Sequence, residues 1–203
     1  MRVVVIEGPE PAVSLVEAKR HLRIVDTDGD GNVLPSEDDP YVEALIAAAQ
    51  GHIDGPTGWL GRAIGVQTLE ADLDGFVYDR IDLPYRPIID IVSVSYQESA
   101  GQAITLGPSF YQLRGDQLGS AWGQNWPMSR KARIRYRAGY GRWEGEGDDR
   151  KLVTAAPAPI KQAMLLMIGQ WFASREGVVT GTIATELPMA VQALLSPYRV
   201  WVV

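Results

Sequence analysis

Residues 131–138 read Lys-Ala-Arg-Ile-Arg-Tyr-Arg-Ala, and this stretch decides how the middle of the chain folds. Arginine and apolar side chains alternate along it, which is the period-two pattern of a strand that buries one face. An alternating run at residues 67–73 and a β-branched run at residues 88–96 have the same periodicity, and glycines between the runs mark turns. We therefore expect a small antiparallel sheet between about residues 64 and 140.

The sequence before this sheet has helical periodicity. Ser14 and Glu17 form a capping box, in which each side chain accepts a hydrogen bond from a backbone N–H of the first helical turn. Asp39 followed by Pro40 predicts the start of a second helix, because Asp is a favoured cap and proline suits the first turn. The Gly-Pro pair at residues 55–56 predicts its end.

The sequence after the sheet is helical again. Prolines at residues 157 and 159 precede a long apolar-periodic segment, and Arg175 with Gly177 is typical of a helix end. A short helix is expected from Pro188 to about Leu195. This order predicts an α+β fold, mainly α, in which a helical bundle carries an inserted small antiparallel β domain. The expected parts of this one compact domain are N-terminal helices with an acidic loop (1–63), the β insertion (64–150), and C-terminal helices with a tail (151–203).

Composition excludes several classes of function. The 203-residue chain has 19 lysines and arginines against 25 aspartates and glutamates, a net charge of −6, which argues against a surface that grips nucleic acid throughout. Cysteine is absent, so disulfides, thiolate metal sites and cysteine nucleophiles are excluded. His21 and His52 lie in expected helices without an acid–nucleophile set, and no P-loop, nucleophile elbow or zinc-protease motif occurs. We expect no enzymatic activity, no required cofactor and no membrane segment.

Residues 26–37 match the spacing of an EF-hand calcium loop. Carboxylates recur at alternate positions, Gly31 would supply the sharp turn, and the segment joins two expected helices. The calcium ligands would be Asp26, Asp28, Asp30, the Asn32 carbonyl and Glu37. The alternative is an acidic surface loop without metal, because Pro35 is unusual in such a loop and no second loop exists to pair with it.

The strongest positive cluster is formed by Arg133, Arg135 and Arg137, which share one face of the expected strand. One interpretation is a solvated face with salt bridges to neighbouring carboxylates. The other is a subunit interface or a patch that faces nucleic acid. For Trp122 and Trp126, in the glycine-rich stretch just before, a place in the β-domain core or in an oligomer contact is favoured over a sugar or base platform.

The C-terminal tail is apolar and aromatic, which is unusual for a free terminus. Tyr198, Arg199 and Trp201 are residue types that often anchor interfaces. Two interpretations stay open. The tail folds back onto its own helices, or it docks on a neighbouring copy or on a larger ring.

The order of segments along the chain resembles the head–tail connector (adaptor) family of long-tailed bacteriophages and gene transfer agents. Each segment alone is a weak signal, and the specificity comes from their order and spacing across most of the chain. The stretches that carry the resemblance are residues 14–23, 38–46, 81–84, 87–96, 134–141 and 159–163.

The resemblance implies a non-enzymatic structural protein in the neck of a virion, made in the host cytoplasm. It would form a dodecameric ring beneath the portal protein and above a stopper or tail-terminating protein. The genome would pass through the central hole without sequence-specific binding, which the overall acidity suits. In such a heterologous ring, the basic strand face and the acidic first third are complementary candidates for the contact between copies. The alternatives are a calcium-binding EF-hand-like module and another neck or tail protein.

Overall fold

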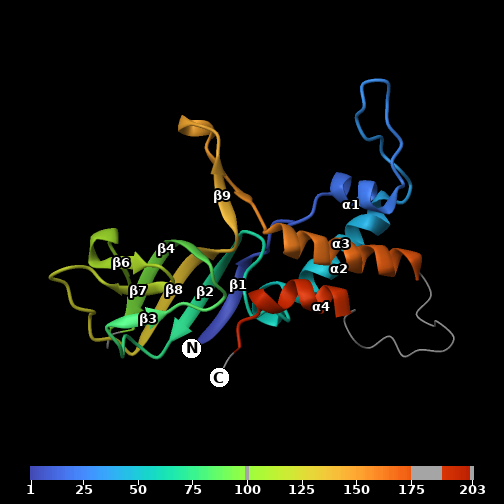
Figure 1. Ribbon diagram of the computed structural model, residues 1–203. Coiled ribbons are helices and arrows are strands. Elements are labelled where there is room, and N and C mark those ends of the chain that lie inside the picture. The colour runs from blue at the N-terminus through green and yellow to red at the C-terminus, as the bar shows by residue number, and fades with distance from the viewer. Residues whose placement is uncertain (99–100, 175–188, 202–203) are drawn as a thin grey trace.

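The computed structural model describes residues 1–98, 101–174 and 189–201. Helices gather at one end of the molecule and strands at the other, and two projections extend from the body, one near its middle and one at the helical end (Figure 1). The helices of the described part are α1 (Leu15–Leu22), α2 (Asp39–Ile53), α3 (Ala158–Ala173) and α4 (Met189–Leu195). No helix in these ranges is both long enough and apolar enough to cross a membrane.

An antiparallel five-stranded sheet dominates the other end. Its order is β1 (Arg2–Glu7), β2 (Gln67–Leu73), β8 (Lys131–Ala138), β4 (Ile88–Gln97) and β5 (Ala103–Leu106). A second sheet has the order β3 (Arg80–Asp82), β7 (Gln117–Ser120) and β6 (Tyr111–Arg114). A two-stranded hairpin is formed by β9 (Gly141–Glu144) and β10 (Lys151–Thr154).

The expectation of a mainly α fold with a small inserted β domain is wrong. Helix and strand each account for 31% of the described residues, and the five-stranded sheet is the largest element. The first strand, β1, lies among the expected N-terminal helices and pairs with β2, about 65 residues further along the chain. Strands of this kind depend on long-range pairing rather than on a local pattern, so periodicity underestimates them.

The capping signals predicted the helix starts better than periodicity predicted the strands. The capping box of Ser14 and Glu17 is present in both directions, which confirms that prediction. The second helix begins one residue earlier than predicted, with Asp38 as its N-cap and Pro40 in the first turn. The expected helix end at Arg175 and Gly177 lies outside the described residues.

The chain builds two hydrophobic cores. In the first, α2 and α3 pack against each other through buried side chains such as Ile46, Ile53 and Met164. In the second, the inner face of the five-stranded sheet, with Leu69 and Ile134, packs against the three-stranded sheet. The outer face of the five-stranded sheet carries Arg133, which is exposed, and Arg135 and Arg137, which are half-buried, and we call it the open face.

A buried carboxylate joins the two cores. Asp54 follows α2 and is 5% exposed. Its Oδ1 accepts hydrogen bonds from the Ile64 N–H and the Gln67 amide, both at 2.7 Å, and its Oδ2 accepts from the Gly65 N–H and the Gln50 amide, both at 2.9 Å. Burial raises the pKa of Asp54, and these four donors oppose that shift. The network thereby fixes the end of α2 to the start of β2.

Candidate functional site: the open face, its two ends and the tail

The arginines of the open face are paired with carboxylates of the same chain. Glu70, on the neighbouring strand β2, lies between two of them. Its Oε1 is 3.1 Å from Arg133 Nε and its Oε2 is 2.7 Å from Arg135 Nη2. Arg133 also contacts Asp72 at 3.0 Å, and the hydrogen bond to Asp72 raises the pKa of the arginine. The β2–β8 register that pairs Glu70 with Arg135 produces this ladder.

The third arginine is paired on the other side of the strand. Arg137 makes a bidentate contact with Asp90 on β4, with Nε 2.8 Å from Oδ1, and this contact raises the pKa of the arginine. Its guanidinium also lies 5.3 Å from the centre of the Trp143 ring, with Arg150 at 4.9 Å from the same ring. The positive cluster expected from the sequence is therefore neutralised within the chain. Its role as an interface stays a prediction.

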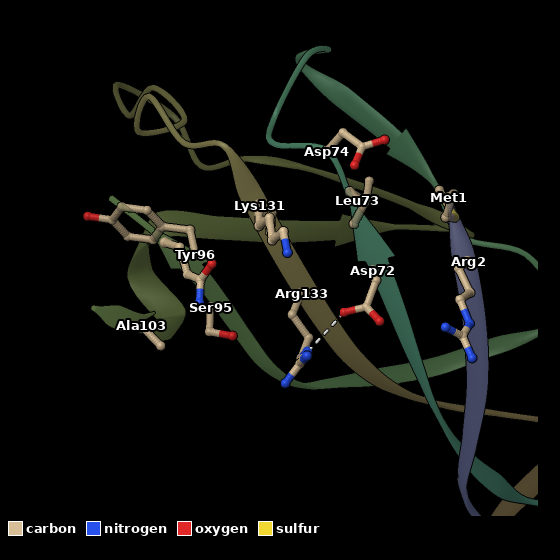
Figure 2. Close-up of a pocket in the computed structure, with 12 residues that line it drawn as sticks. Met1, Arg2, Asp72, Leu73, Asp74, Ser95, Tyr96, Ala103, Lys131 and Arg133 are labelled. Atoms are coloured by element: carbon tan, nitrogen blue, oxygen red, sulfur yellow. Dashed lines mark hydrogen bonds and ion pairs between the residues drawn. The ribbon is translucent and has the colours of Figure 1, made fainter. Parts of the chain in front are cut away.

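An open cavity of about 620 Å³ lies at the end of the open face where β8 begins. Arg2 of β1 and Lys131 of β8 carry the cations at its edge, beside the Asp72–Arg133 pair (Figure 2). Its lining residues are Met1, Arg2, Asp72, Leu73, Asp74, Ser95, Tyr96, Gln97, Ala103, Lys131, Ala132 and Arg133.

The β9–β10 hairpin extends from the opposite end of the sheet, and we call residues 141–154 the arm (Figure 1). Every side chain from residue 141 to 151 is exposed. The base of the arm is fixed by Leu152, which lies next to Gly141, and by the Trp143 ring between two arginines. From its sequence this segment was expected at the end of the β insertion, and its hairpin was not predicted.

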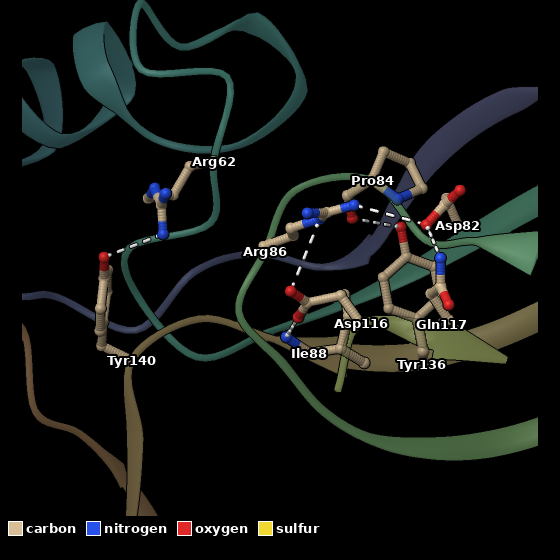
Figure 3. A network of polar contacts seen from close by, with 9 residues as sticks. All are labelled: Arg62, Asp82, Pro84, Arg86, Ile88, Asp116, Gln117, Tyr136 and Tyr140. Atoms are coloured by element: carbon tan, nitrogen blue, oxygen red, sulfur yellow. Dashed lines mark hydrogen bonds and ion pairs between the residues drawn. The ribbon is translucent and has the colours of Figure 1, made fainter. Parts of the chain in front are cut away.

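A polar network fixes the loop that leads into β4 (Figure 3). Arg86 Nε lies 3.5 Å from Asp116 Oδ2, and Asp116 Oδ1 accepts a hydrogen bond from the Ile88 N–H at 3.0 Å. The Tyr136 hydroxyl donates to the Pro84 carbonyl at 3.1 Å, and burial raises the pKa of this tyrosine. Strand β4 is thereby held beside β8, so that Asp90 can reach its arginine.

The described part of the C-terminal tail packs against the same chain. The Arg199 guanidinium is stacked between the rings of Trp59, at 4.2 Å, and Trp201, at 4.0 Å. Arg62 Nε donates to the Tyr198 carbonyl at 2.8 Å, and the same arginine binds the Tyr140 hydroxyl at 3.0 Å (Figure 3). The outer tryptophan, Trp201, is 70% exposed, so it is available for a further contact.

The two tryptophans of the glycine-rich stretch differ in environment. Trp126 stacks on Phe76 at 4.4 Å, and its indole N–H donates to the Asp79 carbonyl at 3.1 Å. It therefore packs at the edge of the sheet core. Trp122 is 95% exposed.

The acidic loop is organised by one of its predicted ligands. Asp28 Oδ1 accepts from the backbone N–H groups of Asp30, at 3.0 Å, and Asn32, at 2.8 Å, and Oδ2 accepts from the Asn32 amide. These bonds lower the pKa of Asp28, the contact with Asn32 most of all. No three His, Cys, Asp or Glu side chains of the described ranges lie close enough together to hold a metal ion. Calcium binding, with Asp26 and Glu37 as further ligands, stays a prediction.

Comparison with known proteins found a shared fold. A chain from "Neck of empty GTA particle computed with C6 symmetry" matches with a TM-score of 0.67 at 21% sequence identity. A chain from a virion of a native gene transfer agent (GTA) particle matches at 0.65 and 22%, and one from "Neck of native GTA particle computed with C12 symmetry" matches at 0.64 and 20%. Each match covers 100% of this chain and 97% of the other. No family model and no curated protein matched the sequence. From end to end, the chain has the fold of a protein found in gene transfer agent particles.

Proposed function

We propose that this protein is a structural component of the neck of a phage-like particle. The observation that carries the proposal is the full-length fold match to chains of gene transfer agent particles, two of them from necks computed with C6 or C12 symmetry. A resemblance confined to one part of the fold would not cover 100% of this chain and 97% of the other. The protein would act by forming contacts, without catalysis.

The finer proposal is a dodecameric connector ring. It would dock under the portal protein, rest on a stopper or tail-terminating protein, and surround the passing genome. The open face supports free passage of DNA, because each of its three arginines is paired with a carboxylate of the same chain. Arginines that are already paired offer phosphates little to hold, and Arg2 and Lys131, which are unpaired in the described ranges, lie at one end of the face. Assembly would take place in the host cytoplasm, with the finished protein in the particle neck.

Imaging of the purified protein with and without portal rings tests this proposal. We expect rings of regular size, alone or seated on the portal. A protein that remains monomeric by light scattering and does not associate with portal rings would contradict it. Binding to isolated tail components instead of the portal would favour a different neck or tail protein.

A further inference from the structure

The cavity at the start of β8 contains cations without partners. Within the described ranges, Arg2 and Lys131 form neither a side-chain hydrogen bond nor an ion pair, unlike the adjacent Arg133. Arg130, the next residue along the chain, is exposed and likewise unpaired there, and Asp74 is the one unpaired carboxylate in the lining. The cavity therefore has an excess of positive charge and favours a negatively charged occupant.

The tip of the arm carries the opposite charge. Glu146, Asp148 and Asp149 occupy three of four consecutive positions, are exposed, and have no side-chain partner in the described part of the chain. The turn that presents them is tight, because Gly145 has a φ of +84° and a Cβ there would lie 2.7 Å from the Asp149 carbonyl. The acidic tip is thus held on a defined turn at the end of a projection.

The arm and the cavity lie at opposite ends of one strand. Strand β8 begins at Lys131, in the cavity, and ends at Ala138, three residues before the arm begins. A projection and a depression placed in this way cannot meet within one chain. They can meet between copies, and a contact between two different surfaces of identical chains generates a ring or a filament.

We propose that the arm tip, residues 146–149, binds in the cavity of a second copy, with its carboxylates facing Arg2 and Lys131. This inference rests on the proposed ring assembly and deepens it by naming the surfaces that join neighbouring copies. A cavity of about 620 Å³ is large enough for two aspartate side chains and their turn. Exposed ion pairs are individually weak, so the contact gains strength from its repetition around a closed ring.

The acidic α1–α2 loop is the competing occupant. Its carboxylates are spread over residues 26–37, and Asp28 is already bonded within the loop. The arm concentrates its three carboxylates on one turn. The arm therefore fits a small cationic cavity better than the loop does.

The absence of cysteine from the sequence allows a direct test by cross-linking. In the variant Asp148→Cys/Lys131→Cys, the two thiols lie at opposite ends of the sheet, so a disulfide between them must join two copies. Mild oxidation of the assembled protein is expected to give a ladder of covalent multimers that reductant dissolves. Each single-cysteine variant should give dimers at most, because one thiol per copy cannot extend a chain.

Two matched variants locate the contact. Asp148→Cys with Arg20→Cys places the second thiol on an exposed arginine of α1, far from the cavity, and should give no ladder. Asp30→Cys with Lys131→Cys asks whether the acidic loop occupies the cavity. A ladder from this variant, or none from Asp148→Cys/Lys131→Cys, would overturn the proposal.

Charge exchange gives an independent measurement. Lys131→Asp and Asp148→Lys should each raise the protein concentration needed for half-maximal assembly by about fivefold, and the double variant should restore it. Failure to restore assembly would refute the pairing. If the wild type forms rings but Asp148→Cys/Lys131→Cys gives no cross-linked ladder, the arm contact is refuted and the neck function stands. A wild-type protein that never assembles, alone or with portal rings, would refute both.

Discussion

Replacement of Asp54 by asparagine tests the connection between the two cores. Asparagine has nearly the same shape, but one carboxylate oxygen becomes an NH₂ group that faces two N–H donors. Two of the four hydrogen bonds to residue 54 are therefore lost. At about 1.5–3 kcal/mol for each bond to a charged acceptor, the loss is about 3–6 kcal/mol.

Part of this loss is recovered, because the variant no longer buries a charge that is 5% exposed. The raised pKa of Asp54 is a sign of that cost, which amounts to about 1.4 kcal/mol for each pKa unit. We expect a net decrease of about 3 kcal/mol in the free energy of unfolding. For a chain of this size, this lowers the melting temperature by about 6–12 °C.

Urea denaturation followed by circular dichroism measures this change. Asp74→Asn is the matched control, because this aspartate is exposed and unpaired in the described ranges, and its variant should unfold like the wild type. A decrease of less than about 1 kcal/mol for Asp54→Asn would show that the four donors do not stabilise the junction and would refute the reasoning.

Three further predictions concern the start of α2, the acidic loop and the C-terminal tail. The contact with the buried Lys19 lowers the pKa of Asp39. The stabilisation that this contact gives is therefore present above the unfolded pKa of about 3.9 and is lost as the pH falls through the lower folded pKa. The melting temperatures of Asp39→Asn and wild type should converge in acid, and a constant difference would contradict this. If the acidic loop binds calcium, calorimetry should give a dissociation constant between about 10⁻⁵ and 10⁻³ M that Glu37→Gln abolishes, whereas no heat at millimolar calcium would exclude the site. Arg199→Ala should lower the free energy of unfolding by about 1–2 kcal/mol because it removes both ring contacts. Trp201→Ala should lower it by less than about 1 kcal/mol and yet abolish co-sedimentation with portal rings. Unchanged co-sedimentation would exclude docking through this tryptophan.

The sequence predicts the elements that local rules govern. The capping box at Ser14 and the alternation along residues 131–138 depend on neighbours within a few positions, and both are present in the structure. Strand β1 could not be predicted in this way, because its four apolar residues do not alternate and it pairs with a distant strand. The arm lies in a glycine-rich acidic segment that is typical of a loop, so its hairpin was missed as well.

Candidate surface residues were found only in part. Alternation placed the three arginines of β8 on one face but did not identify their partners. A signal was present, because polar Thr68, Glu70 and Asp72 alternate along β2 and must face the same way once the two strands pair. The stacking of Arg199 against Trp59 had no such signal, since about 140 residues separate the two in sequence.

The arginine ladder of the open face also determines how salt can act on this surface. When a basic protein binds DNA, its cations displace condensed counterions from the phosphates, and that release makes the affinity fall steeply with salt. Arg133, Arg135 and Arg137 are already neutralised by Glu70, Asp72 and Asp90, so binding a phosphate would first require breaking an internal ion pair. Contact between DNA and these three arginines should therefore release few counterions, and its strength should change little between low and physiological ionic strength. The variant Glu70→Gln, which frees Arg135 and leaves Arg133 paired with Asp72 alone, should introduce a salt dependence that the paired arginines of the wild type lack.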